Sequence, residues 1–269
     1  MVSAVIITKN EEKNIEDCIK SILWVDEIIV VDAESRDKTI EIANRYTSKV
    51  IVRKWTSYSD QKNHGINLAK NNWILSIDAD ERVSEELTKE ILNLGDLRIE
   101  NSTVRGYKMP IKNYYFDRFL KHGGFFPDYH LRLFNKRYGK FESTIIKVHE
   151  GIHVDGAIEC LNGCIVHYAY NNIKDYFTKF NKYTTMEANG YFNNKITPTG
   201  YNLIIKPLHR FIKSYIIRVG FLDGIAGFLA CIFSSFYIFV AELKLIEYYR
   251  FNNKNINLLS TLFKRVKKT

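Results

Sequence analysis

Apolar and polar positions follow two different periods along the first ninety residues. Short apolar runs, typical of buried strands, are separated by segments whose apolar residues recur every three or four positions, as on one face of a helix. The predicted strands are Ala4–Thr8, Glu27–Asp32, Lys49–Val52 and Trp73–Ile77. Strands that alternate with helices across turns of only a few residues predict βα units around a mostly parallel sheet, an α/β fold.

Three helices are expected between these strands. One face of the first carries Ile15, Cys18, Ile19 and Ile22. The side-chain oxygen of Asn10 is a candidate to cap this helix. The second helix is expected from about Asp37, and the third from about Asp60 to Ala69.

The pattern changes after residue 100. Aromatic and His-rich segments with paired glycines predict mixed strands and loops up to about residue 170, completing one face of the sheet. Helical periodicity returns near Asn172 and continues to about Arg250. Within it, Gly224 to Ala241 is an uncharged run of 18 residues. We therefore expect a main domain over residues 1–198 and a helical tail over residues 199–269.

Composition excludes several classes of protein. With 269 residues, 46% of them apolar and 26% charged, the chain is not a disordered tail, a collagen-like fibre or a multi-span membrane protein. Its four cysteines form no CxxC pair and are too few to brace a chain of this length, which favours a reducing, cytosolic setting. The opening run lacks the features of a signal peptide, so we expect no export.

The net charge of +9 is distributed unevenly. From Thr199 onward there are 11 basic and 3 acidic residues, whereas residues 1–198 are close to neutral. Such asymmetry indicates an anionic partner, either a nucleic acid or a membrane surface, although a solvated basic face needs no partner at all. The cations flank the apolar run instead of lining a fold face, so we expect an anionic membrane and no nucleic acid.

The uncharged run itself allows three arrangements. It could belong to a pair of amphipathic helices at the membrane interface, pack in the soluble core or an oligomer contact, or span the bilayer, for which 18 residues is the lower limit. The flanking basic residues favour the interfacial arrangement. They are Lys206, Arg210, Lys213 and Arg218 before the run, and Lys264, Arg265, Lys267 and Lys268 at the end of the chain.

Candidate chemistry lies where the predicted strands end. Residues 8–12, 32–35 and 78–81 bring polar or acidic groups to three strand ends, which meet at one rim of a parallel sheet. No glycine precedes Gly65, so neither GxGxxG nor the P-loop motif can lie in the first βα turns. This excludes classical dinucleotide dehydrogenases and P-loop kinases.

An acidic rim without a glycine cradle repels phosphates unless a cation intervenes. Asp78 and Asp80 offer hard oxygen ligands to Mg²⁺ or Mn²⁺, which would bridge two phosphates of a nucleotide. The alternative is that both residues only cap the following helix. Because Asp32 and the Thr8–Glu11 turn share the rim, we favour the metal–nucleotide interpretation.

Four segments in order, 7–12, 30–39, 61–63 and 75–81, resemble family-2 glycosyltransferases, which have the A-type nucleotide-diphospho-sugar transferase (GT-A) fold. Later segments resemble the branch that includes lipopolysaccharide-core β-1,4-glucosyltransferases. These are Pro127-Asp128, Arg132-Leu133-Phe134, Val148-His149-Glu150, His167-Tyr168 and Lys182-Tyr183. The resemblance is clearest over residues 1–185.

The resemblance assigns roles to individual positions. It implies nucleotide contacts from Thr8, Asn10, Glu11 and Asp32, and contacts to the diphosphate or sugar from Lys62 and Asn63. It also implies that Asp78 faces the ribose and the metal and that Asp80 binds the metal directly. The chain departs from the family where a D-[DS]-G-S-type loop becomes Asp32-Ala33-Glu34-Ser35, so the turn at Glu34 is expected to differ.

Family membership implies inversion by single displacement, which requires a general base, and a carboxylate is the natural choice. Glu150 is the first candidate and Asp128 the second. His149 is a further candidate ligand for metal or phosphate, and Arg132 could pair with the diphosphate or with a neighbouring carboxylate.

The expected donor is a UDP-sugar, first of all UDP-glucose, and the expected acceptor is a lipid-linked or lipopolysaccharide-core saccharide. Such an acceptor would place the enzyme on the cytoplasmic face of the inner membrane, attached peripherally through residues 199–269. Two other classes stay open, a nucleotidyltransferase on a related fold and a basic nucleic-acid-binding module. The first usually carries a glycine-rich basic loop after the first strand, which this chain lacks.

Overall fold

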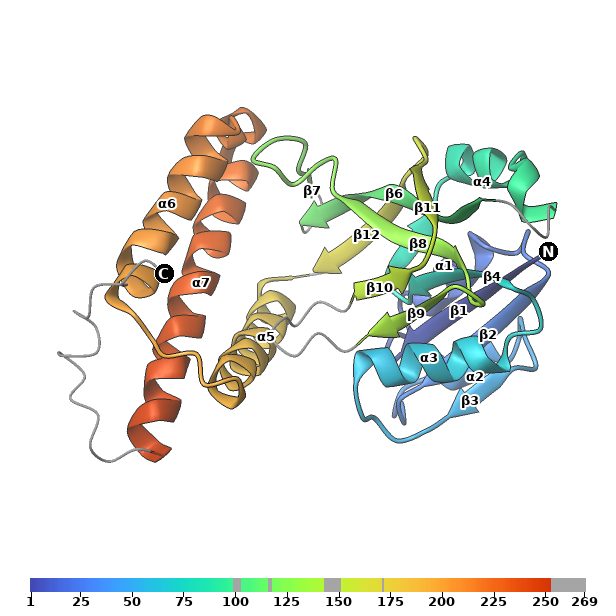
Figure 1. Cartoon of the computed structure of the whole chain (residues 1–269), viewed down its shortest axis with the longest axis horizontal. Helices are drawn as coiled ribbons and strands as arrows, with labels where there is room; N and C mark the ends of the chain where they lie inside the picture. The colour runs from blue at the N-terminus through green and yellow to red at the C-terminus, as the bar shows by residue number, and fades with distance from the viewer. Residues whose placement is uncertain (99–102, 116–117, 143–150, 171, 253–269) are drawn as a thin grey trace. The chain divides into compact units, whose positions relative to one another are not determined.

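A computed structural model describes residues 1–98, 103–115, 118–142, 151–170 and 172–252 (Figure 1). Within these ranges the chain forms two compact units. The sheet unit contains residues up to 114, then 127–142 and 151–169. The helical unit contains the described residues of 115–126 and those from 170 to 252.

The first half of the sheet unit confirms the predicted βα pattern. Strands β1 (Val2–Thr8), β2 (Glu27–Asp32), β3 (Val50–Val52) and β4 (Trp73–Asp78) lie parallel in the order β3-β2-β1-β4. Every residue of β1 is buried. A strand covered on both faces needs apolar residues on both, which is why β1 reads as a continuous apolar run instead of an alternating one.

The helices of this half are α1 (Ile15–Lys20), α2 (Thr39–Ala43), α3 (Tyr58–Leu68) and α4 (Glu85–Leu92), followed by a short 3₁₀ turn, η1 (Gly95–Arg98). The predicted apolar face of α1 is fully buried. The predicted cap at Asn10 is wrong, because α1 begins five residues later, after Asn14. Asn10 instead adopts a φ of +55°, which asparagine tolerates, and its side-chain oxygen accepts a hydrogen bond from the Arg36 amide at 2.8 Å.

The second half of the sheet is mixed, as the sequence pattern predicted. The strands that follow β4 in the chain are β5 (Glu81–Val83), β6 (Val104–Tyr115), β7 (Arg118–Phe119), β8 (Tyr129–Asn135), β9 (Gly139–Glu142), β10 (Gly151–Val154), β11 (Ala157–Cys160) and β12 (Ile165–Tyr170). The sheet continues beyond β4 in the order β8-β6-β12-β5, with β8 antiparallel to both of its neighbours. Strands β9 and β10 form a separate antiparallel pair.

Helix α3 lies very close to the sheet, and a glycine permits this approach. A Cβ atom on Gly65 would lie 2.5 Å from Cγ1 of Val5 and 3.0 Å from Cγ2 of Val31. Lys62 precedes Gly65 by three positions and therefore shares its helical face. The tight packing of α3 thus brings a lysine side chain toward the sheet.

The helical unit contains α5 (Ile173–Asn193), a π-helical turn η2 (Tyr201–Ile205), α6 (Lys206–Ile212), a second π-helical turn η3 (Lys213–Ile217), a 3₁₀ turn η4 (Gly220–Asp223) and α7 (Gly224–Asn252). The predicted helical region is confirmed. Since α5 belongs to this unit, the second compact unit begins before residue 199. The division into a catalytic domain, 1–198, and a tail, 199–269, stays a prediction about function.

The apolar core under β1 should dominate the stability of the sheet unit. Ile6 is fully buried in this central strand, so Ile6→Ala should lower the free energy of unfolding by about 2–5 kcal/mol through lost burial and a cavity. Leu23 is 55% exposed, and Leu23→Ala should change the free energy of unfolding by less than about 0.5 kcal/mol. Urea unfolding of the two variants measures both values. Equal losses would contradict the assignment of β1 to the core.

Candidate functional site

Three strand ends meet at one rim of the sheet, as predicted. In the strand register Thr8 lies beside Asp32, and Ile7 lies beside Asp78. The ends of β1, β2 and β4 therefore deliver their polar residues to the same edge. The Thr8 hydroxyl is buried there and has no hydrogen-bond partner among the described residues. Because a buried polar atom is costly when unpaired, this hydroxyl is suited to meet a ligand.

The loop after β2 has a left-handed residue where the family motif has glycine. Glu34 has a φ of +58°, in the region that glycine adopts most readily. The buried Asp32 carboxylate holds the turn by accepting hydrogen bonds from the Ser35 amide (2.7 Å) and hydroxyl (2.5 Å). These two bonds offset the cost of a positive φ at a non-glycine residue.

The loop after β1 is tied to the loop after β2. The Asn10 amide donates to the Ser35 hydroxyl at 2.8 Å, and the Glu11 amide donates to the Thr39 hydroxyl at 2.8 Å. Asn10 and Glu11, both implied in nucleotide contacts by the resemblance, thus belong to one hydrogen-bonded pair of loops beside Thr8 and Asp32.

A partly buried cluster of two carboxylates and two cations lies at the end of β4. Asp78 Oδ1 lies 3.0 Å from Lys62 Nζ, and Asp78 Oδ2 lies 3.2 Å from Arg132 Nη2. The same Arg132 nitrogen lies 2.5 Å from Glu81 Oε1, while Glu81 Oε2 accepts the Asp78 amide at 2.8 Å. We call these four residues, which come from α3, β4, β5 and β8, the carboxylate cluster.

Charge pairing sets the ionisation of this cluster. Burial by itself raises the pKa of Asp78, but attraction to Lys62 and Arg132 outweighs it and lowers the pKa to about 2. Burial raises the pKa of Glu81, and Arg132 compensates only in part. Burial lowers the pKa of Arg132, but Glu81 and Asp78 together raise it above its ordinary value. Asp78 is therefore ionised and already neutralised by protein cations.

Asp80 has a different environment. Its Oδ2 lies 3.4 Å from Nε2 of His167, whose Nδ1 lies 2.8 Å from the side-chain oxygen of Asn113. Burial lowers the pKa of His167, but attraction to Asp80 outweighs it and raises the pKa above its usual value. The Asp80 carbonyl accepts the Tyr168 amide at 3.0 Å, which fixes β12 beside this turn.

The alternative role of Asp78 and Asp80 as helix caps is wrong. Helix α4 begins at Glu85, and its N-cap is Ser84, whose hydroxyl accepts the Leu87 amide at 3.2 Å. A strand, β5, separates the two aspartates from the helix, so neither carboxylate is at a capping position.

The described residues by themselves offer an incomplete set of ligands for a metal ion. Over the described ranges, no group of three or more His, Cys, Asp or Glu side chains is arranged to hold one. Asp80 and His167 offer one carboxylate and one imidazole, an incomplete set for Mg²⁺ or Mn²⁺. Phosphate oxygens of a bound nucleotide could complete it, so the donor set fits a metal held jointly by protein and substrate.

The remaining predicted residues have varied environments. Asn63 is committed to the backbone of Phe141, to which it donates at 2.8 Å and from which it accepts at 3.0 Å, and so it anchors β9. Asp128 is exposed before β8, with its carboxylate 2.9 Å from Nε2 of His130. Of the two partners expected for Arg132, the structure shows the carboxylates. His149 and Glu150 lie outside the described residues.

Sequence reasoning assigned no role to two residues of the site, Glu81 and His167. Both stand in segments that carried the family resemblance, but nothing in the pattern linked them. Antiparallel pairing of β12 with β5 sets His167 opposite Glu81 and beside the Asp80 turn. That pairing joins residues more than eighty positions apart, and no local period reveals it.

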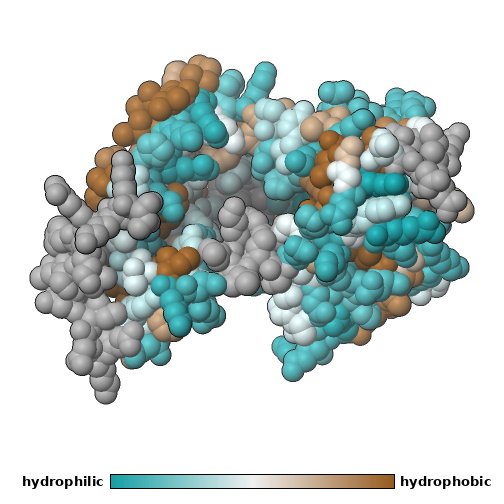
Figure 2. Space-filling view, viewed as in Figure 1, coloured by the Kyte–Doolittle hydropathy of each residue, from teal (hydrophilic) through white to brown (hydrophobic). Residues whose placement is uncertain are grey.

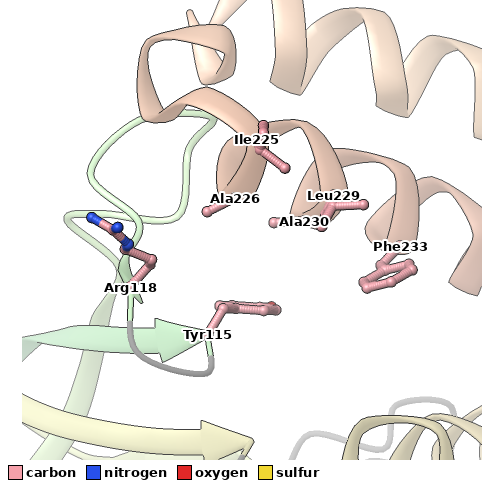
Figure 3. Close-up of a pocket in the computed structure, with 7 residues that line it drawn as sticks. All are labelled: Tyr115, Arg118, Ile225, Ala226, Leu229, Ala230 and Phe233. Carbon is pink, nitrogen blue, oxygen red and sulfur yellow. The ribbon is translucent and has the colours of Figure 1, made fainter. Parts of the chain in front are cut away.

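A separate pocket lies in the helical unit (Figure 3). Its volume is about 230 Å³, and its lining consists of Tyr115, Arg118, Ile225, Ala226, Leu229, Ala230 and Phe233. Figure 3 shows the five α7 side chains along one wall and Tyr115 opposite them. With one charged side chain in its lining, this pocket suits an apolar group and not a nucleotide.

Taken together, the parallel half-sheet, its acidic rim and the absence of a glycine-rich phosphate loop define an α/β enzyme of the nucleotide-diphospho-sugar transferase type, with the GT-A fold. Comparison with known proteins gives the family. The profile described as Glycosyl transferase family 2 matches residues 3–142, more than half of the chain, and the chain belongs to this family. The expected fold class and family are therefore confirmed.

Similar proteins include an uncharacterized glycosyltransferase of Rickettsia bellii, 33% identical over 91% of this chain and 86% of that protein. The lipopolysaccharide core biosynthesis glycosyltransferase LpsC of Rhizobium meliloti is 27% identical over 91% of this chain and 92% of its own. Among solved structures, glucosyl-3-phosphoglycerate synthase of Mycobacterium tuberculosis, in complex with Mg²⁺ and UDP, is 21% identical with a TM-score of 0.35. That match covers 42% of this chain and 44% of that protein.

The low pKa of Asp78 predicts an acid-sensitive contribution to stability. Because the folded-state pKa of about 2 lies below the ordinary value of 3.8, this contribution is present above about pH 4 and is lost as the pH falls toward 2. Between pH 5 and pH 2 the wild-type protein should lose about 1–2 kcal/mol more unfolding free energy than Asp78→Asn. Denaturant titrations across this range measure the difference. The exposed control Asp155→Asn should follow the wild type, and parallel curves for all three proteins would contradict the assignment.

Proposed function

We propose that this family-2 glycosyltransferase transfers a hexose from a nucleoside diphosphate sugar to a saccharide acceptor, with inversion at the anomeric carbon. UDP-glucose is the first candidate donor. A lipid-linked or lipopolysaccharide-core saccharide is the candidate acceptor, and the likeness to LpsC over nearly the whole of both chains supports it. The structural observation that carries the proposal is the rim where Thr8 and Asp32 end β1 and β2 and Asp80 follows the end of β4.

The nucleotide would bind along this rim. The buried, unpartnered hydroxyl of Thr8 and the adjacent carboxylate of Asp32 offer one donor and several acceptors to a base or ribose. Asn10 and Glu11 lie in the loop beside them. Lys62 and Arg132 compensate Asp78, so the cluster adds little repulsion against an incoming diphosphate.

Asp80 and His167 would hold Mg²⁺ or Mn²⁺ together with phosphate oxygens of the donor. The ion would supply Lewis-acid stabilisation to the negative charge that develops on the leaving nucleoside diphosphate. The contact between His167 and Asn113 fixes the imidazole ring, so that Nε2 is the nitrogen directed at Asp80. Asp78 would act beside them as a positioning residue, held by its two cations.

A carboxylate would take the proton from the attacking acceptor hydroxyl. We propose Glu150 for this role, with Asp128 as the second candidate, from the segments that resemble the acceptor side of the family. Asp128 is exposed in this structure and adjacent to the imidazole of His130. His149, next to Glu150, is proposed as an additional ligand for metal or phosphate.

The enzyme would act on the cytoplasmic face of a membrane, attached through residues 199–269. In the described part of the chain, one helix, Gly220–Asn252, is long and apolar enough to cross a bilayer, and its most apolar 18-residue stretch has a mean hydropathy of 2.0. Its apolar character supports membrane association without deciding between insertion and spanning.

Asp80→Asn should abolish sugar transfer and leave the fold intact, because an amide is a much weaker metal ligand than a carboxylate. Melting curves supply a readout apart from activity. Among UDP-, GDP- and TDP-sugars with Mn²⁺, the true donor should stabilise the wild type by mass action, and Asp80→Asn should lose the Mn²⁺-dependent part. Exposed Asp17→Asn is the matched control. Near-normal turnover of Asp80→Asn at saturating Mn²⁺ would overturn the metal assignment.

Glu150→Gln should lower kcat by at least about a hundredfold, since general-base catalysis typically contributes this much, and should leave donor affinity nearly unchanged. Asp128→Asn is the matched comparison, measured in the same transfer assay. A large loss in Asp128→Asn alone would transfer the role to the second candidate. Weakened donor binding with intact turnover would place Glu150 in the pocket lining instead.

A further inference from the structure

The helical unit exposes large apolar side chains where α6 and η3 turn back into α7. We call residues 216–225 the hairpin tip. Six of its side chains are 37% to 79% exposed, namely Ile216, Ile217, Val219, Phe221, Leu222 and Ile225. Figure 2 shows brown, apolar surface at the upper left, over the end of α6 and the start of α7. Soluble surfaces rarely gather so many large apolar residues unless something covers them.

The apolar surface continues down the first helix of the hairpin. Ile204, Leu208 and Ile212 are exposed and recur every four residues, in line with Ile216 of the tip. Residues at this spacing share one helical face. The exposed stripe is therefore a property of the helix face and not a scatter of single side chains.

Hydrogen bonds and close packing hold the hairpin tip in a defined conformation. The Asp223 carboxylate accepts the His122 amide at 2.7 Å and contacts Nδ1 of the same histidine at 2.7 Å. The Gly123 amide donates to the Arg218 carbonyl at 2.8 Å. Gly220 is buried against Cys231, where an added Cβ would lie 2.9 Å from the sulfur. The exposed apolar side chains thus project from a fixed corner.

The exposed charged side chains around the hairpin tip are basic. Lys206, Lys213 and Arg218 are exposed, whereas Asp223 is the only acid between residues 199 and 241 and is already paired with His122. Apolar side chains bordered by exposed cations complement a surface with an apolar interior and anionic head groups. A nucleic acid would match the cations but not the apolar tip, and a protein partner would not require this bias in charge.

The C-terminal half of α7 makes polar and charged contacts, which suit an aqueous environment. Lys244 Nζ lies within hydrogen-bond distance of four oxygens of α5, which share its three protons: the Asn181 carbonyl (2.9 Å), the Asn181 side-chain oxygen (2.7 Å), the Thr184 hydroxyl (2.8 Å) and the Thr185 hydroxyl (2.7 Å). Glu242 accepts the Thr199 amide at 2.7 Å. Helix α5 in turn exposes charged side chains. Inserting this half of α7 into hydrocarbon would bury those charges, which is costly.

From these observations we propose that the hairpin tip inserts into one leaflet of an anionic membrane, while the C-terminal half of α7 stays packed against α5 outside it. The helical unit is then a monotopic anchor that does not span the bilayer. This inference rests on the proposed function, which places the enzyme at a membrane, and adds the residues and the mode of attachment.

Vesicle sedimentation of the full chain tests the surface. The triple variant Ile217→Ser/Leu222→Ser/Ile225→Ser should bind vesicles of phosphatidylcholine with phosphatidylglycerol at least about tenfold more weakly than the wild type, because it loses three inserted side chains. The matched control Leu23→Ser/Val52→Ser/Leu92→Ser changes three exposed apolar residues of the sheet unit and should bind as the wild type does. Equal binding by both variants, or by the wild type to pure phosphatidylcholine, would overturn the proposal.

Tryptophan quenching by brominated lipid tests the mode. In a tip insertion, Leu222→Trp should be quenched strongly and Leu243→Trp little, since Leu243 lies beside the polar contacts with α5. A spanning α7 would place the two positions near opposite interfaces and quench them equally, which would overturn the monotopic anchor. The three natural tryptophans lie in the sheet unit and give a constant background.

The two proposals fail in distinguishable ways. The triple tip variant should keep the stabilisation by UDP-sugar with Mn²⁺, because the nucleotide residues lie in the sheet unit. If vesicle binding depends on the tip but no nucleotide stabilises the protein, the membrane surface stands and the enzymatic proposal falls. If nucleotides stabilise the protein and vesicles do not bind it, the anchor falls and the enzymatic proposal stands.

Discussion

The arrangement of the site depends on the pairing of Asp78 and Glu81 with Lys62 and Arg132. Two carboxylates buried together would repel one another and would cost several kcal/mol each to remove from water. Two cations from distant parts of the chain balance them. Because the cations come from α3 and β8, the cluster joins the parallel half of the sheet to the antiparallel half at the rim.

This charge pairing gives Asp78 and Asp80 different environments. Asp78 is neutralised by protein cations, whereas Asp80, two residues later, faces an imidazole across 3.4 Å. In a strand that continued past Asp78, these two side chains would point to the same face, but β4 ends at Asp78, and the turn that follows places Asp80 beside β12. Two residues of one short motif thereby have separate environments, one that holds the fold and one that we propose for the metal.

The helical unit shows a similar division along a single helix. The beginning of α7 carries no charge and lies at a corner rich in exposed apolar residues, while its end forms partly buried polar contacts with α5. An 18-residue stretch of this helix is apolar enough to span a membrane. In our proposal the helix does not span the membrane, because its C-terminal half packs against α5 through lysine and hydroxyl groups, and such polar contacts need water around them.

The sequence by itself determined the elements of the parallel half-sheet and the rim at their ends, because burial on both faces imposes local apolar periods. Once these apolar runs are recognised as strands, motifs such as Asp78-Ala79-Asp80 can be placed at the strand ends. The partners were decided by tertiary structure: Arg132 with Asp78 and Glu81, His167 with Asp80, and Asn63 with the β9 backbone. Such contacts depend on strand order and antiparallel register over long separations, which leave no periodic trace. For α7, the sequence shows that the first half is apolar. Only the packing of α5 and α6 against it determines its surroundings.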